Sequence, residues 1–221
     1  MQPSTETPFR DLTVSQFVER LASPEPVPGG GSASAIAAAL GAGLVSMVAQ
    51  LSRGRERYAA YEATLERALG TGDRLARRFP ELADEDAAAY AAFAAALKLP
   101  RETAEEQAAR RAALQAAARG AAEAPLACVE ACLDLATAAE SLAGRSNRNA
   151  SSDVAVAALL AQAAGHGAAA NVLTNLPAIG DDELGDRLTR RVEALLQAID
   201  DLADRTQEVV AAGELRDAEP A

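Results

Sequence analysis

The chain contains 221 residues, of which 49% are hydrophobic and only 3% aromatic, and its formal net charge is −11 at pH 7. This length fits one domain with a sizeable core, and the scarcity of aromatic residues favours closely packed helices over a sheet. The excess of acidic residues argues against a nucleic-acid partner and against binding to an anionic membrane surface.

The N-terminal part of the chain is expected to hold a flexible arm and two helices. Residues 1–10 form the arm and lack the apolar run of a signal peptide, which favours a cytoplasmic protein. Thr13 and Gln16 have the spacing of a capping box, so a short helix is expected from residue 14 to residue 21. A longer helix is expected over residues 32–51. Its uncharged stretch is rich in Ala, Gly and Ser, which predicts a buried helix rather than a membrane span.

Helical spacing of apolar residues continues through the rest of the chain. Pro80 and Pro125 each favour the start of a new segment or a kink. Helices are therefore expected over residues 55–79, 80–97, 104–119, 125–142, 154–172 and 183–210. The tail over residues 213–221 is expected to fray. Together these elements predict an all-α, antiparallel multi-helix bundle, with a single domain over residues 11–212 that dimerises through its helices.

Metal and histidine chemistry are not indicated. Cys128 and Cys132 are four residues apart, which is not the spacing of a CxxC redox or zinc motif. We interpret them as small buried residues in a reducing compartment. His166 is the only histidine, so neither a zinc site nor a histidine-based triad is expected, and we interpret it as part of a helix surface or core.

The most informative stretch of the chain is Pro28, Gly29, Gly30, Gly31 and Ser32. Three consecutive glycines are costly in backbone entropy, so this glycine loop is expected to need unusual dihedrals or a close approach. A glycine-rich loop that leads into a helix offers free N–H groups and a partial positive charge, which suits an anionic or polar ligand. The alternative is a flexible turn in which Ser32 is an ordinary N-cap.

Two acids and the only lysine are candidates for chemistry. Asp84 and Asp86 point apart on a helix, and a carboxylate on a buried face would have a raised pKa that suits acid–base work. Both could instead be acids that complement a helix dipole. Lys98 is the only lysine in a chain that has 20 arginines. It is therefore either retained for its titratable ammonium group or is a surface residue without a function.

A third polar cluster joins Ser152 and Asp153 to the segment from Asn171 to Pro177. Asn175 could cap the end of a helix, or its amide could read the donor and acceptor edge of a heterocycle.

These motifs occur in an order that resembles the cyclodeaminase/cyclohydrolase family. The order is Pro28 to Ser32, Asp84-Glu85-Asp86-Ala87, Leu97-Lys98-Leu99-Pro100, Ala124-Pro125-Leu126, Ser152-Asp153 and Asn171-Val172-Leu173-Thr174-Asn175-Leu176. Each motif alone is weak, but the ordered set is fairly specific and covers residues 11–210. The family includes the C-terminal half of formiminotransferase-cyclodeaminase and stand-alone methenyltetrahydrofolate cyclohydrolases.

The resemblance implies an all-α homodimer that acts on a one-carbon tetrahydrofolate, with no metal and no cofactor beyond this substrate. The family's catalytic aspartate falls on Asp84, and Asp86 is close enough in register to share the assignment. The expected folate contacts are Pro28, Gly29, Gly30, Gly31, Ser32, Lys98, Asp153 and Asn175. Lys98, Arg101 or the N–H groups of the glycine loop could hold the anionic glutamate tail of the substrate.

Two reactions fit this resemblance. In cyclodeamination, 5-formiminotetrahydrofolate closes to 5,10-methenyltetrahydrofolate and releases ammonia; in cyclohydrolysis, water opens the methenyl form. Both pass through a tetrahedral carbon between N5 and N10 and need protons moved among nitrogen and oxygen, which one carboxylate could do. The alternatives are a folate-binding module without catalysis and a purely structural helical dimer.

Overall fold

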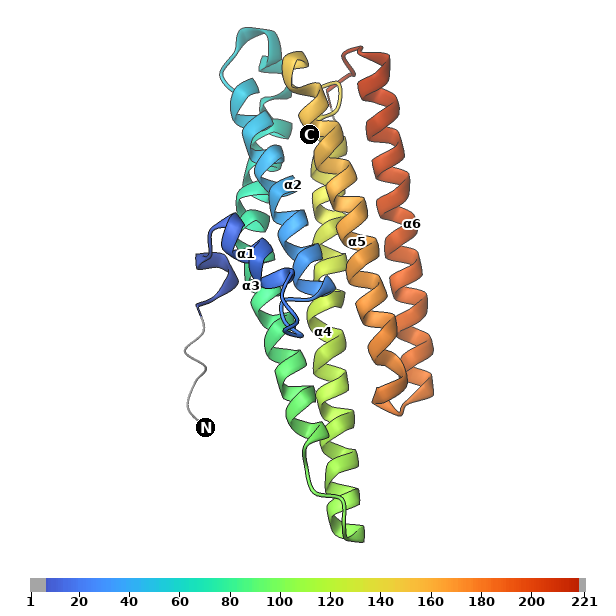
Figure 1. Ribbon diagram of the computed structural model, residues 1–221. Coiled ribbons are helices and arrows are strands. Elements are labelled where there is room, and N and C mark those ends of the chain that lie inside the picture. Colours follow the sequence, from blue (N-terminus) through green and yellow to red (C-terminus); the bar gives the residue numbers. More distant parts are fainter. Residues whose placement is uncertain (1–6, 219–221) are drawn as a thin grey trace.

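The computed structural model describes residues 7–218, and every regular element in this range is a helix (Figure 1). The α-helices are α1 (Val14–Leu21), α2 (Gly30–Ser52), α3 (Glu62–Leu97), α4 (Ala104–Leu142), α5 (Ser151–Ile179) and α6 (Asp182–Ala212). Short 3-10 helices are η1 (Phe9–Asp11), η2 (Glu56–Tyr61) and η3 (Arg148–Ala150). The predicted all-α class is therefore confirmed.

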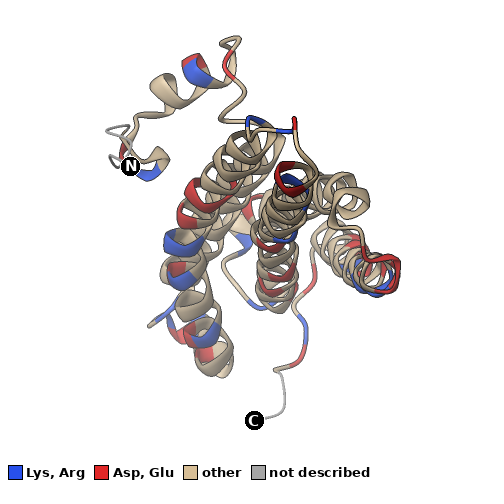
Figure 2. Cartoon of the chain, turned by 90° about the horizontal axis from the view of Figure 1, so that it is seen from below, with Lys and Arg blue, Asp and Glu red and all other residues tan. Residues whose placement is uncertain are grey.

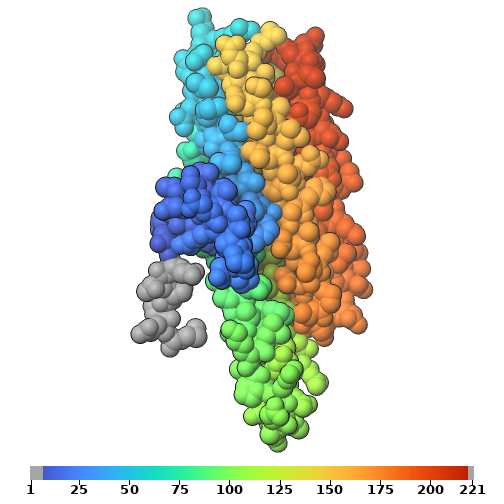
Figure 3. All heavy atoms as spheres, in the orientation of Figure 1, coloured from blue at the N-terminus to red at the C-terminus, as the bar shows by residue number. Residues whose placement is uncertain are grey.

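Helices α2 to α6 run up and down as a bundle, and two parts of the chain project from it. The segment with η1 and α1 lies outside the bundle on the α3 side (Figures 1 and 2). The hairpin of α3 and α4 extends beyond the shared end of α5 and α6 (Figures 1 and 3). α1 begins with the predicted capping box between Thr13 and Gln16.

The helices are longer than expected because they run through their prolines. A boundary or kink is expected at Pro80 and Pro125, but α3 and α4 continue through both residues. A proline inside a helix removes one backbone hydrogen bond and crowds the preceding turn. At Pro80 the neighbouring Phe79 is fully buried in the core, and such packing stabilises the helix on both sides of the defect. α5 likewise passes Pro177 and ends at Ile179, with Gly180 as its C-cap at a φ of +68°.

The core is built largely from alanine. The residues of α2 that face the bundle are small and fully or almost fully buried: Ala35, Ala38, Ala42 and Ala49. Its largest exposed apolar residues face outward: Leu40, Met47 and Leu51. α5 repeats this arrangement, with Ala157, Ala161, Ala164 and Ala168 inside and Val156, Leu159 and Leu173 outside. Both stripes are apolar, so hydrophobic periodicity alone could not decide which one faces inward.

Two helical stretches are long and apolar enough to cross a membrane when only length and composition are considered, namely Gly30–Ser52 and Arg148–Ile179. Within the bundle, 50% and 44% of their most apolar windows are buried. A core helix of a globular bundle meets the same criterion. The inner face of α2 is thus buried as expected, whereas its outer face is exposed.

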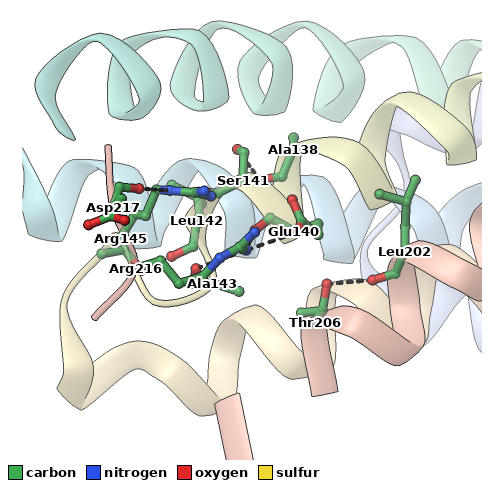
Figure 4. Close-up of polar contacts among 11 residues, drawn as sticks. Ala138, Glu140, Ser141, Leu142, Ala143, Arg145, Leu202, Thr206, Arg216 and Asp217 are labelled. Carbon is green, nitrogen blue, oxygen red and sulfur yellow. Dashed lines mark hydrogen bonds and ion pairs between the residues drawn. The ribbon is translucent and has the colours of Figure 1, made fainter. Parts of the chain in front are cut away.

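The chain after α6 is bound to the end of α4 and to the loop that follows it (Figure 4). Arg216 donates from Nη1 to Glu140 Oε1 over 2.8 Å, and Arg145 donates from Nε to the Asp217 carbonyl over 2.7 Å. Gly144 has a φ of +70°, and a Cβ there would lie 2.9 Å from Cγ of Arg216. Glycine is therefore required both by the backbone angle and by the close approach.

The expected arm and tail lie partly outside the described residues, which exclude 1–6 and 219–221. Within the described part of the tail, Tyr61 donates its hydroxyl to the Arg216 carbonyl over 2.7 Å. Within the described part of the arm, the backbone N–H of Phe9 donates to Asp84 Oδ1 over 2.7 Å. These contacts hold both ends of the described part of the chain against the bundle.

The two cysteines lie in the core, and the histidine lies on the surface of a helix. Cys128 and Cys132 are free and buried, as predicted. A hydrogen bond with Cys128 and burial together raise the pKa of the Cys132 thiol well above its ordinary value. His166 is on the exposed surface of α5, with Nε2 2.9 Å from Asp200 Oδ1.

Candidate functional site

A cleft of about 300 Å³ opens where the start of α2 meets α3, α4 and α5. It is lined by Pro26, Val27, Gly29, Gly30 and Gly31, by Asp86, Tyr90 and Phe93 of α3, by Ala121 of α4, and by Asn171, Thr174 and Asn175 of α5. The glycine loop, Asp86 and Asn175 are far apart in the sequence, yet the fold brings them to one place. Asp86 is the only acid among these described lining residues.

Asp86 lies against the first turn of α2. The Ser32 hydroxyl donates to Asp86 Oδ2 over 2.9 Å and also approaches the Ala83 carbonyl at 3.2 Å. The backbone N–H of Ser32 also bonds to the carboxylate. α2 has Gly29 as its N-cap and therefore no side-chain cap of its own, so Asp86 of α3 supplies the anion at this helix N-terminus. The interpretation of Ser32 as N-cap is wrong, because the helix already begins at Gly30.

Gly31 permits this close approach. A Cβ at Gly31 would lie 2.6 Å from Cγ and 2.7 Å from Oδ2 of Asp86, a separation that real Cβ atoms essentially never show. At Gly30 the nearest atom to an added Cβ is Asn171 Nδ2 at 3.6 Å, which is an ordinary contact. The requirement for glycine in the loop is therefore strongest at Gly31.

Burial raises the pKa of Asp86 above its ordinary value, while hydrogen bonds from the Ser32 side chain and backbone oppose this rise. The positive end of the helix dipole also favours the ionised carboxylate. Burial prevails, so the proton is held more tightly than on an ordinary aspartate. A carboxyl group of this kind can accept a proton and return it within one reaction cycle.

Asn175 presents an acceptor to the cleft. Its Nδ2 donates to the carbonyls of Ala121 and Asn171, each over 3.0 Å. Both amide N–H groups are thereby used, and no donor to Oδ1 is found among residues 7–218, so this oxygen can accept from an N–H group of a ligand. Asn175 lies inside α5, which ends at Ile179, so the alternative of a helix C-cap is wrong.

Tyr90 and Phe93 complete the wall on the α3 side. They lie one helical turn apart and on the same face as Asp86, as the predicted spacing of this stripe implies. An aromatic wall beside a carboxylate and an amide suits a flat polar heterocycle, because it offers stacking surface next to hydrogen-bonding groups.

The other predicted site residues lie elsewhere. Asp84 accepts from the backbone N–H of Phe9 and lines another cleft, beneath the N-terminal segment, which meets the first only at Val27. The two aspartates therefore face different surfaces, as their spacing predicts. Lys98 is the exposed C-cap of α3, about 18 Å along the helix axis from Asp86. Asp153 lies in the first turn of α5, about 27 Å along that helix from Asn171. Their assigned roles stay predictions.

Pro28 is buried beside the cleft without lining it, and its peptide bond to Val27 is cis. Sequence reasoning did not assign Asn171 or Thr174 to the site. The spacing of Asn171 and Asn175 is the signal that could have found the former, because residues four apart share a helix face. Among the described residues, no group of three or more His, Cys, Asp and Glu is placed to hold a metal ion.

Comparison with known proteins gives consistent results. A sequence profile described as formiminotransferase-cyclodeaminase matches residues 13–194. A methenyltetrahydrofolate cyclohydrolase of Methylorubrum extorquens is 38% identical over 198 residues, which are 90% of this chain and 95% of that protein. A formimidoyltransferase-cyclodeaminase of Rattus norvegicus is 35% identical over 192 residues, but these are only 36% of its length. The crystal structure of formiminotetrahydrofolate cyclodeaminase from Thermotoga maritima matches with a TM-score of 0.83 and 27% identity, covering 92% of this chain and 98% of that one.

The helical bundle and its cleft, with one half-buried acid among amide and aromatic groups, have the features of an enzyme that acts on a small polar molecule. The chain belongs to the formiminotransferase-cyclodeaminase family, as the order of its motifs implies. It spans nearly the whole of the Methylorubrum protein and about a third of the rat protein.

Proposed function

We propose that this chain acts on the carbon between N5 and N10 of tetrahydrofolate, with Asp86 as the acid and base. Methenyltetrahydrofolate cyclohydrolysis ranks first, because the relative of that name aligns over 95% of its length at 38% identity. Formiminotetrahydrofolate cyclodeamination, the activity in the name of the Thermotoga structure, ranks second at 27% identity. The observation that carries the proposal is the Asp86 carboxylate, held at the glycine N-terminus of α2 and facing the cleft.

In cyclohydrolysis, Asp86 first accepts a proton from the water that adds to the methenyl carbon, giving a neutral tetrahedral adduct. The protonated Asp86 then donates to N5 as the bond between this carbon and N5 breaks. The remaining hydroxyl proton leaves to solvent as the carbonyl forms. One water is consumed and one proton is released, and the product is 10-formyltetrahydrofolate. The ionised carboxylate also stabilises the cationic methenyl substrate before attack.

In cyclodeamination, N10 attacks the formimino carbon and loses its proton to Asp86. The carboxyl group then protonates the amino group of the adduct, which leaves as ammonia. One further proton is taken from solvent, because the methenyl product is a cation. The two reactions therefore have opposite proton balances, and higher pH favours cyclohydrolysis over ring closure.

The test is spectroscopic. Methenyltetrahydrofolate absorbs in the near ultraviolet, so purified protein is assayed side by side with 5,10-methenyltetrahydrofolate and with 5-formiminotetrahydrofolate. Turnover of either substrate that is lost in the Asp86→Asn variant supports the proposal. Folate binding without turnover of either substrate would identify a non-catalytic folate-binding module instead.

We also propose that the protein is a homodimer and that it acts in the cytoplasm. The outward faces of α2 and α5 carry exposed apolar residues that include Leu40 and Leu159, at 59% and 48% exposure. A face of this kind suits an interface between identical subunits. Sedimentation of the purified protein should give twice the monomer mass, and Leu40→Glu should reduce it to the monomer. Val14→Glu on α1 is the matched control and should leave the dimer intact.

A further inference from the structure

A second, larger cleft adjoins the candidate active site. It has a volume of about 520 Å³ and lies between the α3–α4 hairpin and the end of α5. Phe93 lines both clefts, so they meet at this side chain. The polar side chains of the second cleft are those of Arg101, Gln107, Arg110, Arg111 and Gln115, and its described lining contains no acid.

Three arginines without an acid are unusual in this chain, which has 32 acidic and 21 basic residues. Arg110 is held in place by a bond from Nη2 to the Leu97 carbonyl, over 3.2 Å. Its Nε is buried and has no hydrogen-bond partner, so one donor of the guanidinium is left unused. Within the described residues, neither Arg101 nor Arg111 forms an ion pair. The cleft thus combines three guanidinium groups with a described lining that contains no acid, which is the chemistry that recognises carboxylates.

The two clefts lie in line along the hairpin. On α3, Leu97 lies about 16 Å beyond Asp86, and on α4, Arg111 lies about 15 Å beyond Ala121, both towards the hairpin tip. A folate is a linear molecule in which a p-aminobenzoyl ring separates the reacting carbon from the glutamate carboxylates. With the reacting carbon at Asp86, the ring would pass Phe93 and the carboxylates would enter the arginine cleft.

We propose that Arg110 and Arg111, assisted by Arg101, bind the carboxylates of the substrate's glutamate tail. This inference rests on the proposed folate activity. It gives the tail a site other than Lys98 or the N–H groups of the glycine loop, because Lys98 lines neither cleft and the loop is occupied by Asp86. The arginines are positioned far from the reacting carbon, so they bind ground state and transition state alike. Their loss should therefore raise KM and leave kcat nearly unchanged.

The experiment compares two substrates and two double variants. The substrates are 5,10-methenyltetrahydrofolate and 5,10-methenyltetrahydropteroate, which lacks the glutamate. The variant Arg110→Gln with Arg111→Gln should raise KM for the first substrate about tenfold or more and leave KM for the second unchanged. The control variant, Arg187→Gln with Arg190→Gln on α6, removes the same charge and should match the wild type. An unchanged KM for the first substrate, or an equal rise for both substrates, overturns the proposal and leaves the folate activity standing.

A binding measurement tests the arginine cleft even if neither folate turns over. Calorimetry is performed with p-aminobenzoylglutamate and with p-aminobenzoate on the wild type and on the Arg110/Arg111 variant. We expect the wild type to bind the glutamate conjugate more tightly, with an affinity that falls with salt, and we expect the variant to lose this preference. Equal binding of the conjugate by the wild type and the variant overturns the proposal.

Discussion

The substitution Gly31→Ala tests whether the close approach of α2 and α3 sets the position of Asp86. The new Cβ would lie 2.6 Å from Cγ of Asp86, whereas ordinary contact begins at 3.4 Å. The carboxylate must therefore move by about 0.8 Å, and its hydrogen bond from Ser32 must lengthen or break. A misplacement of about 1 Å can lower a catalytic rate by about a hundredfold.

The effect of Gly31→Ala on stability should be smaller than its effect on rate. Overpacking costs about 1–3 kcal/mol, and the better helix propensity of alanine offsets about 1 kcal/mol of this. The net loss of about 0–2 kcal/mol corresponds to a fall in Tm of at most about 8 °C for a chain of this size. The variant should consequently remain folded at 25 °C while its kcat falls by about two orders of magnitude.

The assay is the decay of methenyl absorbance, with circular dichroism to follow the thermal transition. Gly70→Ala on α3 is the matched control, because a Cβ there has no atom within 4 Å. It should keep the wild-type kcat. A folded Gly31→Ala protein with wild-type kcat/KM would refute the argument that this glycine positions Asp86, and so would an equal loss in the control.

Three further predictions concern single side chains. Burial raises the pKa of Asp86 in the folded protein, so the stability that the protonated carboxyl group contributes is full below the ordinary value of 3.8 and is lost as pH rises through the folded pKa. By denaturant titration, Asp86→Asn should therefore be more stable than the wild type at pH 7 but not at pH 3. The kcat of this variant should fall by about 10²–10⁴. A stability difference that is independent of pH would contradict this reasoning. Asp84→Asn should change kcat less than about threefold and lower the free energy of unfolding by about 1 kcal/mol, because it weakens only the contact with Phe9. A large fall in kcat would indicate that Asp84, and not Asp86, is the catalytic residue. Tyr61→Phe should lower the free energy of unfolding by about 1 kcal/mol through loss of the bond to Arg216, with kcat unaffected.

Local signals in the sequence predicted most of the helices well. The reciprocal bonds of Thr13 with Gln16 and of Thr103 with Glu106 are present, because a capping box depends only on residues three apart. Helix continuity at Pro80 was not predictable in this way. It depends on Phe79 and its neighbours packing against other helices, which no local pattern contains.

The candidate site was predictable in part. The spacing of Asp84 and Asp86 predicts that they face different surfaces, but only the packing of α3 on α2 decides that Asp86 faces the cleft. The arginine cleft could not be predicted for the same reason. Its three arginines come from the hairpin loop and from α4, and they line one cleft only because the end of α5, with its C-cap Gly180, lies beside them.

The contact between Asp86 and Ser32 links proton transfer to local motion. The carboxylate that takes the proton in the proposed reaction is the same anion that satisfies the first turn of α2. Burial raises the pKa of Asp86 while it lies against this turn, and local opening would return that pKa towards its ordinary value, so protonation favours the closed turn and ionisation favours its opening. The amides of residues 30–32 should accordingly lose protection against hydrogen exchange, relative to their intrinsic exchange rates, as pH rises through the pKa of Asp86. In each reaction cycle the mouth of the cleft is then tightest while Asp86 holds the proton, and it loosens again once N5 has received that proton.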